Sequence, residues 1–521
     1  MHLSPLDLVI VAIYILGVLA LAQFASSRKL PSDHTTYTSS SRTLPWWAIG
    51  LSLIAANISA EQIIGMSGSA YALGLAIASY EWMGAATLLI VGKFFLPIFL
   101  TNQVSTMPQF LKRRYGTPVQ IVMAILWIGV YVFVALTASL WLGAVAVHIV
   151  TGLSLWVGLI LLSLFAGNYA LYVEMKSPAY ADLVQVSVLV LGGLVIAIMV
   201  LERIEGGGGL LGLTHGFSVL ATRVPDHFHM ILRADNPYYK YVPGLAVVFG
   251  GMWVINLSYW GFNQYIVQRA LTAKNIAEVQ KGVVFAAFLK LLVPALVVLP
   301  GIAAVVLLPH LSRPDEAYPR LMITLPNGLL GLVFVALLAA IIASMRSALS
   351  SIATIFTMDV FGVVYKERSQ RQTMIAGQLV AIFALAIATA AAIPFLKGFD
   401  QAFQYIQDYS GFITPGVVVV FLLGIFWKRA TQAGALAAAI GCPIISAAMA
   451  ICFPEIPFMN RIGYVFVILS LLAVAVSLAD RKDRTDTAFA LRDVNFWTGP
   501  AFNVGATVII AILIGFYALW W

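Results

Sequence analysis

The sequence predicts an all-α integral membrane protein with about fourteen transmembrane helices. Hydrophobic residues make up 61% of the 521-residue chain and charged residues only 10%, whereas soluble domains carry about 25% charged residues. The mean hydropathy of +0.94 agrees with that contrast. Apolar runs of about 20 residues, the length that crosses a hydrocarbon core of about 30 Å, recur along the whole chain. Lipid is therefore the expected solvent of most of these residues.

The apolar runs can be placed in order along the chain. They cover residues 6–24, 46–72, 77–100, 118–147, 154–173, 180–201, 243–265, 282–308, 327–362, 373–396, 402–427, 431–453, 461–479 and 498–519. The first run contains Asp7, but no basic region precedes it and no clear small-residue cleavage site follows. We therefore expect a retained helix rather than a signal peptide.

The distribution of Lys and Arg predicts the orientation of the chain. Short loops rich in these residues stay on the cytoplasmic side of a membrane. The loops after the odd-numbered runs hold most of the 30 Lys and Arg residues, including the consecutive Lys112, Arg113 and Arg114. Both termini are therefore expected outside, in a multi-pass protein of the plasma or inner membrane.

The charge and the motifs exclude other classes of protein. The net charge of +8 largely reflects the basic loops, which can also attract anionic lipid headgroups. It therefore gives no reason to expect a nucleic acid partner. No obligate protein partner is evident. The sequence has no catalytic triad, no GxxxxGK phosphate loop and no Cys/His metal cluster, so an enzyme is not expected.

Polar residues and glycine interrupt the second run between Asn57 and Met66. Such a stretch inside a hydrophobic span is typical of a discontinuous helix, whose freed carbonyls coordinate a cation and whose side chains meet a polar solute at mid-membrane. The alternative is a kinked helix held by interhelical hydrogen bonds.

The seventh run repeats this trait between Trp253 and Gln264. Interrupted helices at corresponding places in two halves indicate an inverted-repeat transporter with its site between the halves. The expected organisation is an additional helix and cytoplasmic loop at 1–45, a first repeat of five helices at 46–201, an extracellular loop at 202–242, a second repeat at 243–427 and three additional helices at 428–521.

Five of the ionisable residues inside the apolar runs are the most informative. A charge at bilayer depth costs at least a few kcal/mol unless it faces a partner or a watery cavity, so each is a candidate for a functional site. These residues are Glu61, Glu81, Asp182, Lys290 and Arg346.

Separate motifs give the chain a resemblance to a known family. The motifs are Asn57-Ile-Ser-Ala-Glu-Gln-Ile-Ile-Gly-Met-Ser-Gly68, Ser79-Tyr-Glu-Trp82, Tyr259-Trp-Gly-Phe-Asn-Gln-Tyr265, Ala353-Thr-Ile-Phe-Thr-Met-Asp359 and Phe403-Gln-Tyr-Ile-Gln-Asp-Tyr409. They resemble the sodium:solute symporters, in particular the sodium/glucose cotransporter branch and, within it, bacterial sodium/galactose symporters. The resemblance implies a LeuT-type fold and the movement of a hexose by alternating access, coupled to sodium.

The resemblance also implies which residues bind the sugar. A hexose needs donors and acceptors for its hydroxyl groups and an aromatic against its apolar face. The positions similar to the sugar site are Gln62, Glu81, Asn256, Lys290 and Gln407, with Tyr259 as the inner gate, Asn57 as the partner of that gate, and Met66, Tyr80 and Phe403 on the apolar outer side. The alternative interpretation is structural: Glu81 and Lys290 form an ion pair that locks helices, and the glutamines join helices by hydrogen bonds.

The implied sodium site departs from the family pattern. Similar proteins hold sodium between carbonyls that match Ala55, Ile58 and Ala340 and two adjacent hydroxyl groups, of which only Ser344 remains. Ala343 occupies the first hydroxyl position. Sodium is a hard cation that prefers several oxygen ligands, so this substitution is expected to weaken the site.

Arg346 lies three residues after Ala343, on the same helix face, where similar proteins carry a small residue. Asp182 matches a family acid near the sodium exit. The hypothesis is that Arg346 pairs with Asp182 and acts as a fixed internal cation that weakens coupling. The alternative is that Arg346 extends toward cytoplasmic water.

Three further functions stay open at this point. One is a sodium-independent sugar carrier, either facilitative or proton-coupled, with Glu81, Asp182 and Asp408 as the acids to consider. Another is a related symporter of a non-sugar solute. The last is a sugar sensor that binds but scarcely transports.

Overall fold

The computed structural model describes residues 3–27, 45–104, 106–172, 179–205, 209–270, 273–365, 367, 369–480 and 491–521. These residues form helices joined by short turns, and none of them forms a strand. In chain order the main helices are α1 (Pro5–Ser27), α2 (Trp46–Asn57), α3 (Met66–Leu73), α4 (Ser79–Ile90), α5 (Leu96–Thr101), α6 (Met107–Tyr115), α7 (Thr117–Val130), α8 (Thr137–Thr151), α9 (Leu155–Tyr172), α10 (Ala179–Glu205), α11 (Gly209–Arg223), α12 (Leu245–Phe249), α13 (Gly251–Phe262), α14 (Gln264–Ala270), α15 (Ile276–Leu307), α16 (Ala317–Met322), α17 (Leu329–Ile355), α18 (Gly362–Val364), α19 (Gln370–Leu396), α20 (Ala402–Gly411), α21 (Thr414–Phe426), α22 (Gln432–Cys452), α23 (Phe458–Ala479) and α24 (Pro500–Leu519).

Each of the fourteen apolar runs coincides with one helix or with several consecutive helical segments. Among the described residues, nine helical segments are long and apolar enough to cross a membrane, or ten if α20 and α21, bent by 45° at their junction, form one span. Runs such as 46–72 fall short of this test because the helix is broken within them. The expected multi-pass helical membrane protein is confirmed.

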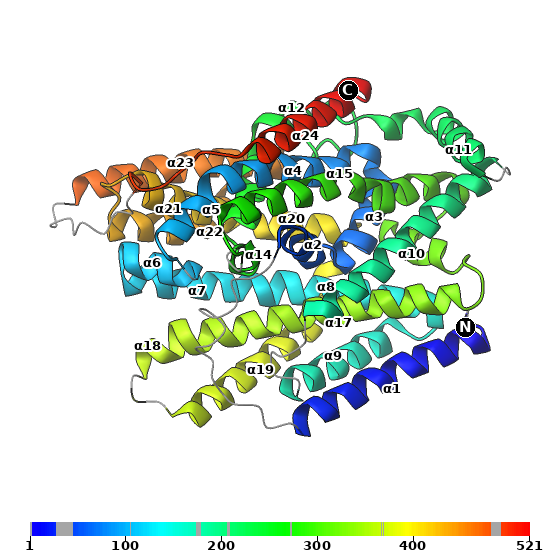
Figure 1. Ribbon diagram of the computed structural model, residues 1–521, viewed down its shortest axis with the longest axis horizontal. Helices are drawn as coiled ribbons and strands as arrows, with labels where there is room; N and C mark the ends of the chain where they lie inside the picture. Colours follow the sequence, from blue (N-terminus) through cyan, green and yellow to red (C-terminus); the bar gives the residue numbers. More distant parts are fainter. Residues whose placement is uncertain are drawn as a thin grey trace.

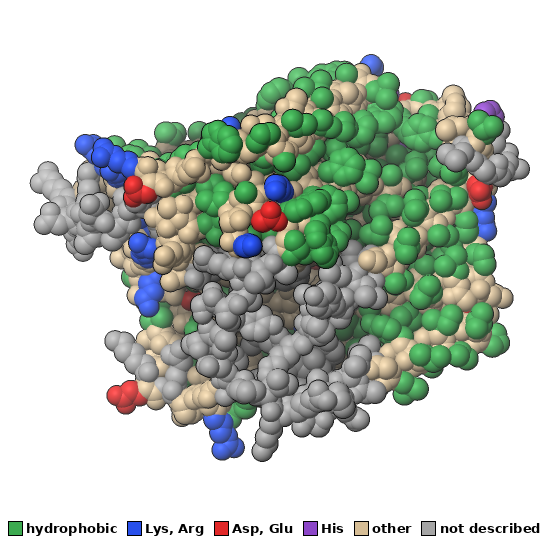
Figure 2. Space-filling model, viewed as in Figure 1, with side chains coloured by type: hydrophobic (Ala, Val, Ile, Leu, Met, Phe, Trp, Pro, Cys, Tyr) green, Lys and Arg blue, Asp and Glu red, His purple; other side chains and the backbone are tan. Residues whose placement is uncertain are grey.

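The helices lie side by side with their axes roughly along one direction of the molecule (Figure 1). The N-terminus and α11 lie at one end of this bundle, and α6 and α18 lie at the opposite end. In the space-filling view, hydrophobic side chains cover most of the described surface between the ends, and Lys and Arg gather mainly toward the end that carries α6 (Figure 2). This distribution suits a lipid belt between two aqueous faces.

The first helix is attached to the core through a buried carboxylate. One oxygen of Asp7 accepts hydrogen bonds from the Ser4 amide and hydroxyl at 2.9 and 2.6 Å. The other accepts from the amides of Gly328 and Gly331, both at 2.7 Å. Because the first amides of a helix have no partner inside it, one carboxylate caps both α1 and α17.

The longest helix, α15, runs through the centre of the bundle and packs against α2, α3, α4 and α10. It contains Pro294 and Pro300, which cannot donate a backbone hydrogen bond to the preceding turn. The carbonyl of Lys290, four residues before Pro294, is therefore released from the helical ladder. A local departure from regular helix is thus built in beside a buried lysine.

The stretch 202–242 is more structured than a simple connecting loop. It contains α11 of 15 residues and a short 3₁₀ turn, Pro225–Phe228, that packs on the turn after α3. The amide of Met230 donates to the carbonyl of Trp520 at 2.7 Å. This segment therefore covers one end of the bundle and holds the end of α24.

Candidate functional site

A cavity of about 330 Å³ lies in the centre of the bundle. Its walls come from the broken helix α2, the following turn, and α4, α7, α13, α15, α17, α20 and α21. Of the residues expected from the sequence, those that line it are Ala55, Asn57, Ile58, Gln62, Tyr80, Glu81, Asn256, Tyr259, Lys290, Ala340, Ala343, Ser344, Arg346, Phe403 and Gln407. The structure therefore brings together residues that lie up to about 350 positions apart in the chain.

The interruption expected in the second run is present. Helix α2 ends at Asn57, and Ile58 takes an extended conformation with φ −71° and ψ 106°. A π-helical turn η1, Glu61–Gly65, then leads into α3. Because the backbone leaves the α-helical ladder here, carbonyls near Ile58 have no standard helical partner. The break places both these carbonyls and the Gln62 side chain at the cavity.

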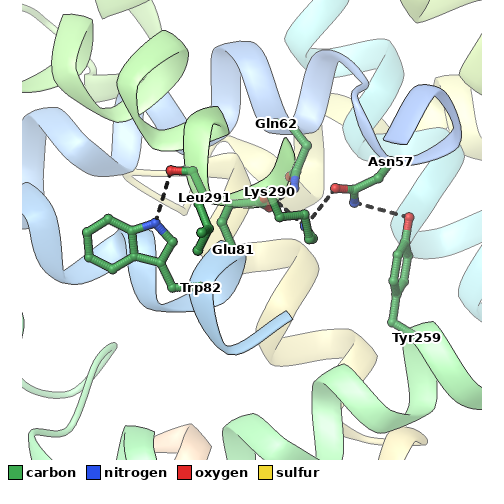
Figure 3. Close-up of polar contacts among 7 residues, drawn as sticks. All are labelled: Asn57, Gln62, Glu81, Trp82, Tyr259, Lys290 and Leu291. Atoms are coloured by element: carbon green, nitrogen blue, oxygen red, sulfur yellow. Dashed lines mark hydrogen bonds and ion pairs between the residues drawn. The ribbon is translucent and has the colours of Figure 1, made fainter. Parts of the chain in front are cut away.

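Polar side chains from four segments form one continuous chain of contacts (Figure 3). Gln62 donates a short hydrogen bond to Glu81, and the ammonium of Lys290 lies 2.5 Å from the other carboxylate oxygen. Lys290 also donates to Asn57 at 2.8 Å, and Asn57 donates to the Tyr259 hydroxyl at 3.4 Å. The charges of Glu81 and Lys290, both about 1% exposed, are thereby paired inside the membrane.

Close packing fixes the side chains of this contact chain in position. Gly84 on α4 faces α13 and α15, and a Cβ atom there would lie 3.0 Å from the Asn256 oxygen and 3.1 Å from Cε of Lys290. The Lys290 ammonium also lies 4.8 Å from the centre of the Trp260 ring, a cation–π distance. Beside it, the Trp82 indole donates to the Leu291 carbonyl at 3.4 Å.

The second expected interruption is present, at the far end of its predicted stretch from Trp253 to Gln264. Helix α13 continues without a break from Gly251 to Phe262, and the chain departs from it only at Asn263, with ψ 122°. The Asn256 amide donates to the Met252 carbonyl of the preceding turn at 3.1 Å. A polar side chain satisfied within its own helix has no need of a break, so Asn256 and Tyr259 sit on a regular helix.

Aromatic residues close one edge of the cavity. The rings of Tyr80 and Phe403 meet edge to face with centroids 5.1 Å apart. Met66 is fully buried and is not among the residues that line the cavity. Gln407 lines the cavity, while the next residue, Asp408, pairs with Arg461 at 2.7 Å.

The residues of the expected ion site come from α2, the break after it, and α17. Ala55, Ile58, Ala340 and Ser344 all line the cavity, as do Ala343 and Arg346. Carbonyl and hydroxyl oxygens are ligands that suit a hard cation such as sodium. The donors that these residues offer are the backbone carbonyls and the Ser344 hydroxyl, and among the described residues no group of three or more His, Cys, Asp or Glu is placed to hold a metal ion. The Asp182 side chain lies outside the residues that the structure describes.

The cavity also contains residues without a predicted role in binding the sugar or the ion. Glu61 lines it and accepts a long hydrogen bond from Ser139 at 3.5 Å. Trp127, Tyr131 and Ser351 extend the wall along α7, η4 (Tyr131–Leu136) and α17. Glu61 was recognisable as an intramembrane acid, whereas aromatic and serine residues in apolar helices give no signal that separates them from packing residues.

A polar cavity enclosed by membrane helices, beside a discontinuous helix, defines a class of protein. It is a LeuT-type secondary transporter, which carries a solute through the bilayer and is not an enzyme.

Comparison with known proteins identifies the family. The chain matches the sodium:solute symporter family over residues 37–441, and it belongs to that family. It is 42% identical to the sodium/glucose cotransporter of Vibrio parahaemolyticus, over 100% of this chain and 99% of that protein. It is 31% identical to the sodium/myo-inositol cotransporter 2 of Mus musculus, over 84% of this chain and 69% of that protein.

A solved structure has the same fold. A Na⁺-coupled sialic acid symporter in a substrate-bound outward-open state superposes with a TM-score of 0.74. The comparison covers 92% of this chain and 100% of that one, at 21% sequence identity. The LeuT-type architecture implied by the resemblance is thus confirmed.

Proposed function

We propose that the protein is a sodium-coupled symporter of a hexose of the glucose or galactose type. The observation that carries this proposal is the contact chain from Gln62 through Glu81 and Lys290 to Asn57 and Tyr259, which lies in an enclosed cavity with aromatic walls. Amide, carboxylate and ammonium groups side by side supply both donors and acceptors, as a ring of hydroxyl groups requires. The names of the relatives support a polyhydroxylated substrate.

The proposed substrate site consists of the residues of this contact chain and their neighbours at the cavity wall. Gln62, Glu81, Asn256, Lys290 and Gln407 hydrogen-bond the sugar, and Tyr259 forms the inner gate that Asn57 holds through its amide. Tyr80, Phe403 and Met66 form the apolar outer side; the rings of Tyr80 and Phe403 meet edge to face, and Met66 is fully buried. Transport follows when the protein exchanges between states that open this site to either side of the membrane.

Sodium enters the proposal as a co-transported ion rather than a resident cofactor. The carbonyls of Ala55, Ile58 and Ala340 and the hydroxyl of Ser344 are the proposed ligands, in a site weakened by Ala343. Arg346, which is half-buried and lines the same cavity, is proposed to tune the coupling together with Asp182. Linkage requires that sodium and sugar each raise the affinity for the other by the same factor.

The topology proposed for the membrane follows from the charge distribution. Both termini lie outside a plasma or inner membrane, the repeats span 46–201 and 243–427, and three helices follow in 428–521. The end of the bundle that carries α6, with Lys112 to Arg114, then faces the cytoplasm. The lipid bilayer and the small-molecule substrate are the proposed partners.

Uptake of radiolabelled galactose, glucose and myo-inositol into proteoliposomes tests the proposal. An inward sodium gradient should drive accumulation of a hexose, whereas an inward proton gradient or no gradient should not. Equilibration without a gradient would point to a facilitative carrier, and preference for myo-inositol or lack of sugar flux would overturn the hexose assignment. The variant Glu316→Gln, outside the cavity, should transport normally and serves as the control.

The sodium site can be tested in the same assay. Ala343→Ser restores a hydroxyl beside Ser344, and Arg346→Ala removes the guanidinium. Each variant should lower the sodium concentration needed for half-maximal uptake. For Ala343→Ser, the decrease should be roughly tenfold if the added ligand is worth about 1.4 kcal/mol. Identical sodium dependence in the parent and both variants would show that Arg346 plays no part in coupling.

A further inference from the structure

The cavity is closed toward one end of the bundle and lined by half-buried residues toward the other. On the closed side, Gly65 packs against Phe403, where a Cβ atom would lie 3.3 Å from that of Phe403. On the other side the wall continues along α17 from Ala340 to Ser351, about 16 Å at 1.5 Å per residue. We call the closed contact between the end of η1 with α3 and the start of α20 the seam.

Several polar side-chain atoms are buried in and around the seam without hydrogen bonds that would offset their loss of water. Within the described part of the chain, the side-chain oxygens of Ser67, Ser69 and Tyr80 and the amides of Gln401 and Gln404 have no hydrogen-bond partner. Burying such groups unpaired costs free energy. A closed seam lined in this way needs a compensating contact, and an open seam would return these groups to water.

Asp315 provides a contact of this kind. It is fully buried in the short turn η6 (Pro314–Glu316), between α15 and α16. Its two carboxyl oxygens accept from the amide of Ala402 at 3.2 and 3.0 Å. Ala402 is the first residue of α20, whose initial amides have no partner within the helix. The carboxyl group therefore holds the start of the helix that carries Phe403 and Gln407.

The same turn is fitted closely against α3. A Cβ atom on Gly68 would lie 2.8 Å from Cα of Asp315 and 2.9 Å from one of its carboxyl oxygens. Only a glycine leaves room for this approach. On the other flank, Arg313 donates to the carbonyl of Lys397 at 2.6 Å, just before α20. The turn thus joins α3 to α20 at the seam.

We propose that Asp315 is the latch of the seam: a positioning residue that holds α20 against α3 and so sets how often the central cavity opens toward η6. No residue of the latch lines the cavity. The inference deepens the proposed function, because an alternating cavity presupposes transport, but it concerns the conformational equilibrium and not the substrate. It can be tested without sugar or sodium.

The test measures how fast engineered thiols react with a charged, water-soluble methanethiosulfonate. The parent carries Cys452→Ser, because Cys452 is exposed whereas Cys442 is buried. Ser69→Cys reports the seam and Ser351→Cys reports the opposite part of the cavity. Both reporters are measured in purified protein at pH 6, with and without Asp315→Ala.

Asp315→Ala should raise the reaction rate at position 69 by about fivefold or more and lower it at position 351, because a shift of population moves the two rates in opposite directions. Gly68→Ala, which pushes the turn away from α3 while keeping Asp315, should shift both rates in the same directions. If Asp315→Ala does not fold, Gly68→Ala decides. Glu316→Gln, which changes the neighbouring acid that pairs with Arg320 but keeps the Asp315 carboxyl group and its contact with Ala402, should shift both rates much less than Asp315→Ala does.

Three outcomes would overturn the latch. One is an unchanged rate at position 69 in the variants that fold. Another is a parallel rise at both positions, which indicates general loosening. The last is an effect of Glu316→Gln as large as that of Asp315→Ala, which would attribute the change in rate to the charge of the turn η6. Normal sugar uptake with an unchanged seam would reject the latch alone, whereas an altered seam without any sugar flux would reject the proposed substrate and keep the latch.

Discussion

The Lys290 ammonium has three interactions, with the carboxylate of Glu81, the amide oxygen of Asn57 and the face of Trp260. A buried ion pair of this kind adds little net stability over an apolar pair, but removal of one partner leaves the other charge stranded. The pair is therefore better explained by what it offers to a solute than by what it adds to folding.

Lys290→Met tests this interpretation at the level of stability. The stranded Glu81 carboxylate should destabilise the protein by about 3 to 5 kcal/mol, seen as a lower midpoint of thermal unfolding in detergent. Adding Glu81→Gln should restore most of that stability without restoring sugar uptake. Lys281→Met, which removes an exposed lysine paired with Glu278, is the control and should change neither quantity. Restored uptake in the double variant would contradict a role for the pair in binding.

Gly84→Ala tests the packing behind the site. The new methyl group would meet Asn256, Lys290 and Trp260 at 3.0 to 3.2 Å, and overpacking of this kind costs about 1 to 3 kcal/mol. Because these neighbours include the expected sugar ligands, uptake at low sugar concentration should fall roughly tenfold. Gly129→Ala adds the same methyl group where nothing lies within 4 Å, and its uptake should equal the parent's. Equal uptake in both variants would show that the site tolerates displacement.

At the scale of helices, the sequence predicts which segments are helical better than it predicts where those helices break or what they contact. The fourteen apolar runs all correspond to helices, because the thickness of the bilayer imposes their length. The break after Asn57 was predictable from polar residues within a span. The same pattern in the seventh run located the second break only to Trp253–Gln264, and it falls at Asn263, because Asn256 bonds within its own helix. Asp315 gave no signal, because the burial of an acid in a short turn depends on neighbours distant in the chain.

The double cap at Asp7 gives a prediction about two helices. Asp7→Ala should leave the amides of Gly328 and Gly331 without their acceptor and cost about 1 to 2 kcal/mol. Ser4→Ala removes only the bond within α1 and should cost less. Thermal unfolding of both variants measures the difference. An equal loss in the two would mean that the carboxylate matters to α1 alone.

At the scale of the whole molecule, the latch should make the conformational equilibrium depend on pH. Burial raises the pKa of Asp315 to about 7. The hydrogen bond from the Ala402 amide and the nearby charge of Arg313 lower this pKa, whereas the charge of Glu316 raises it further. The facing positions Gly68 and Ala402 carry no charged side chain. In an open seam, where water reaches the carboxyl group, its pKa returns toward the ordinary value of 3.8. The closed state therefore binds the proton more tightly, and closure weakens as pH rises from about 4 to 7.

Thiol labelling at position 69, compared at pH 5 and pH 8 and normalised to a small free thiol, measures this effect. Accessibility of the seam should be higher at pH 8. Asp315→Asn keeps an acceptor for the Ala402 amide but cannot ionise, so it should stay closed and lose the pH dependence. A pH response that survives in the Asn variant would assign the titration to another group.

The contact chain in Figure 3 also bears on how firmly a solute can be held. Gln62, Glu81, Lys290 and Asn57 already bond to one another, so an arriving hydroxyl group trades one hydrogen bond for another and gains only the difference. Such exchange favours modest affinity and quick departure. A protein that must surrender its cargo on the far side of a membrane is well served by a site that closes on itself when the cargo leaves.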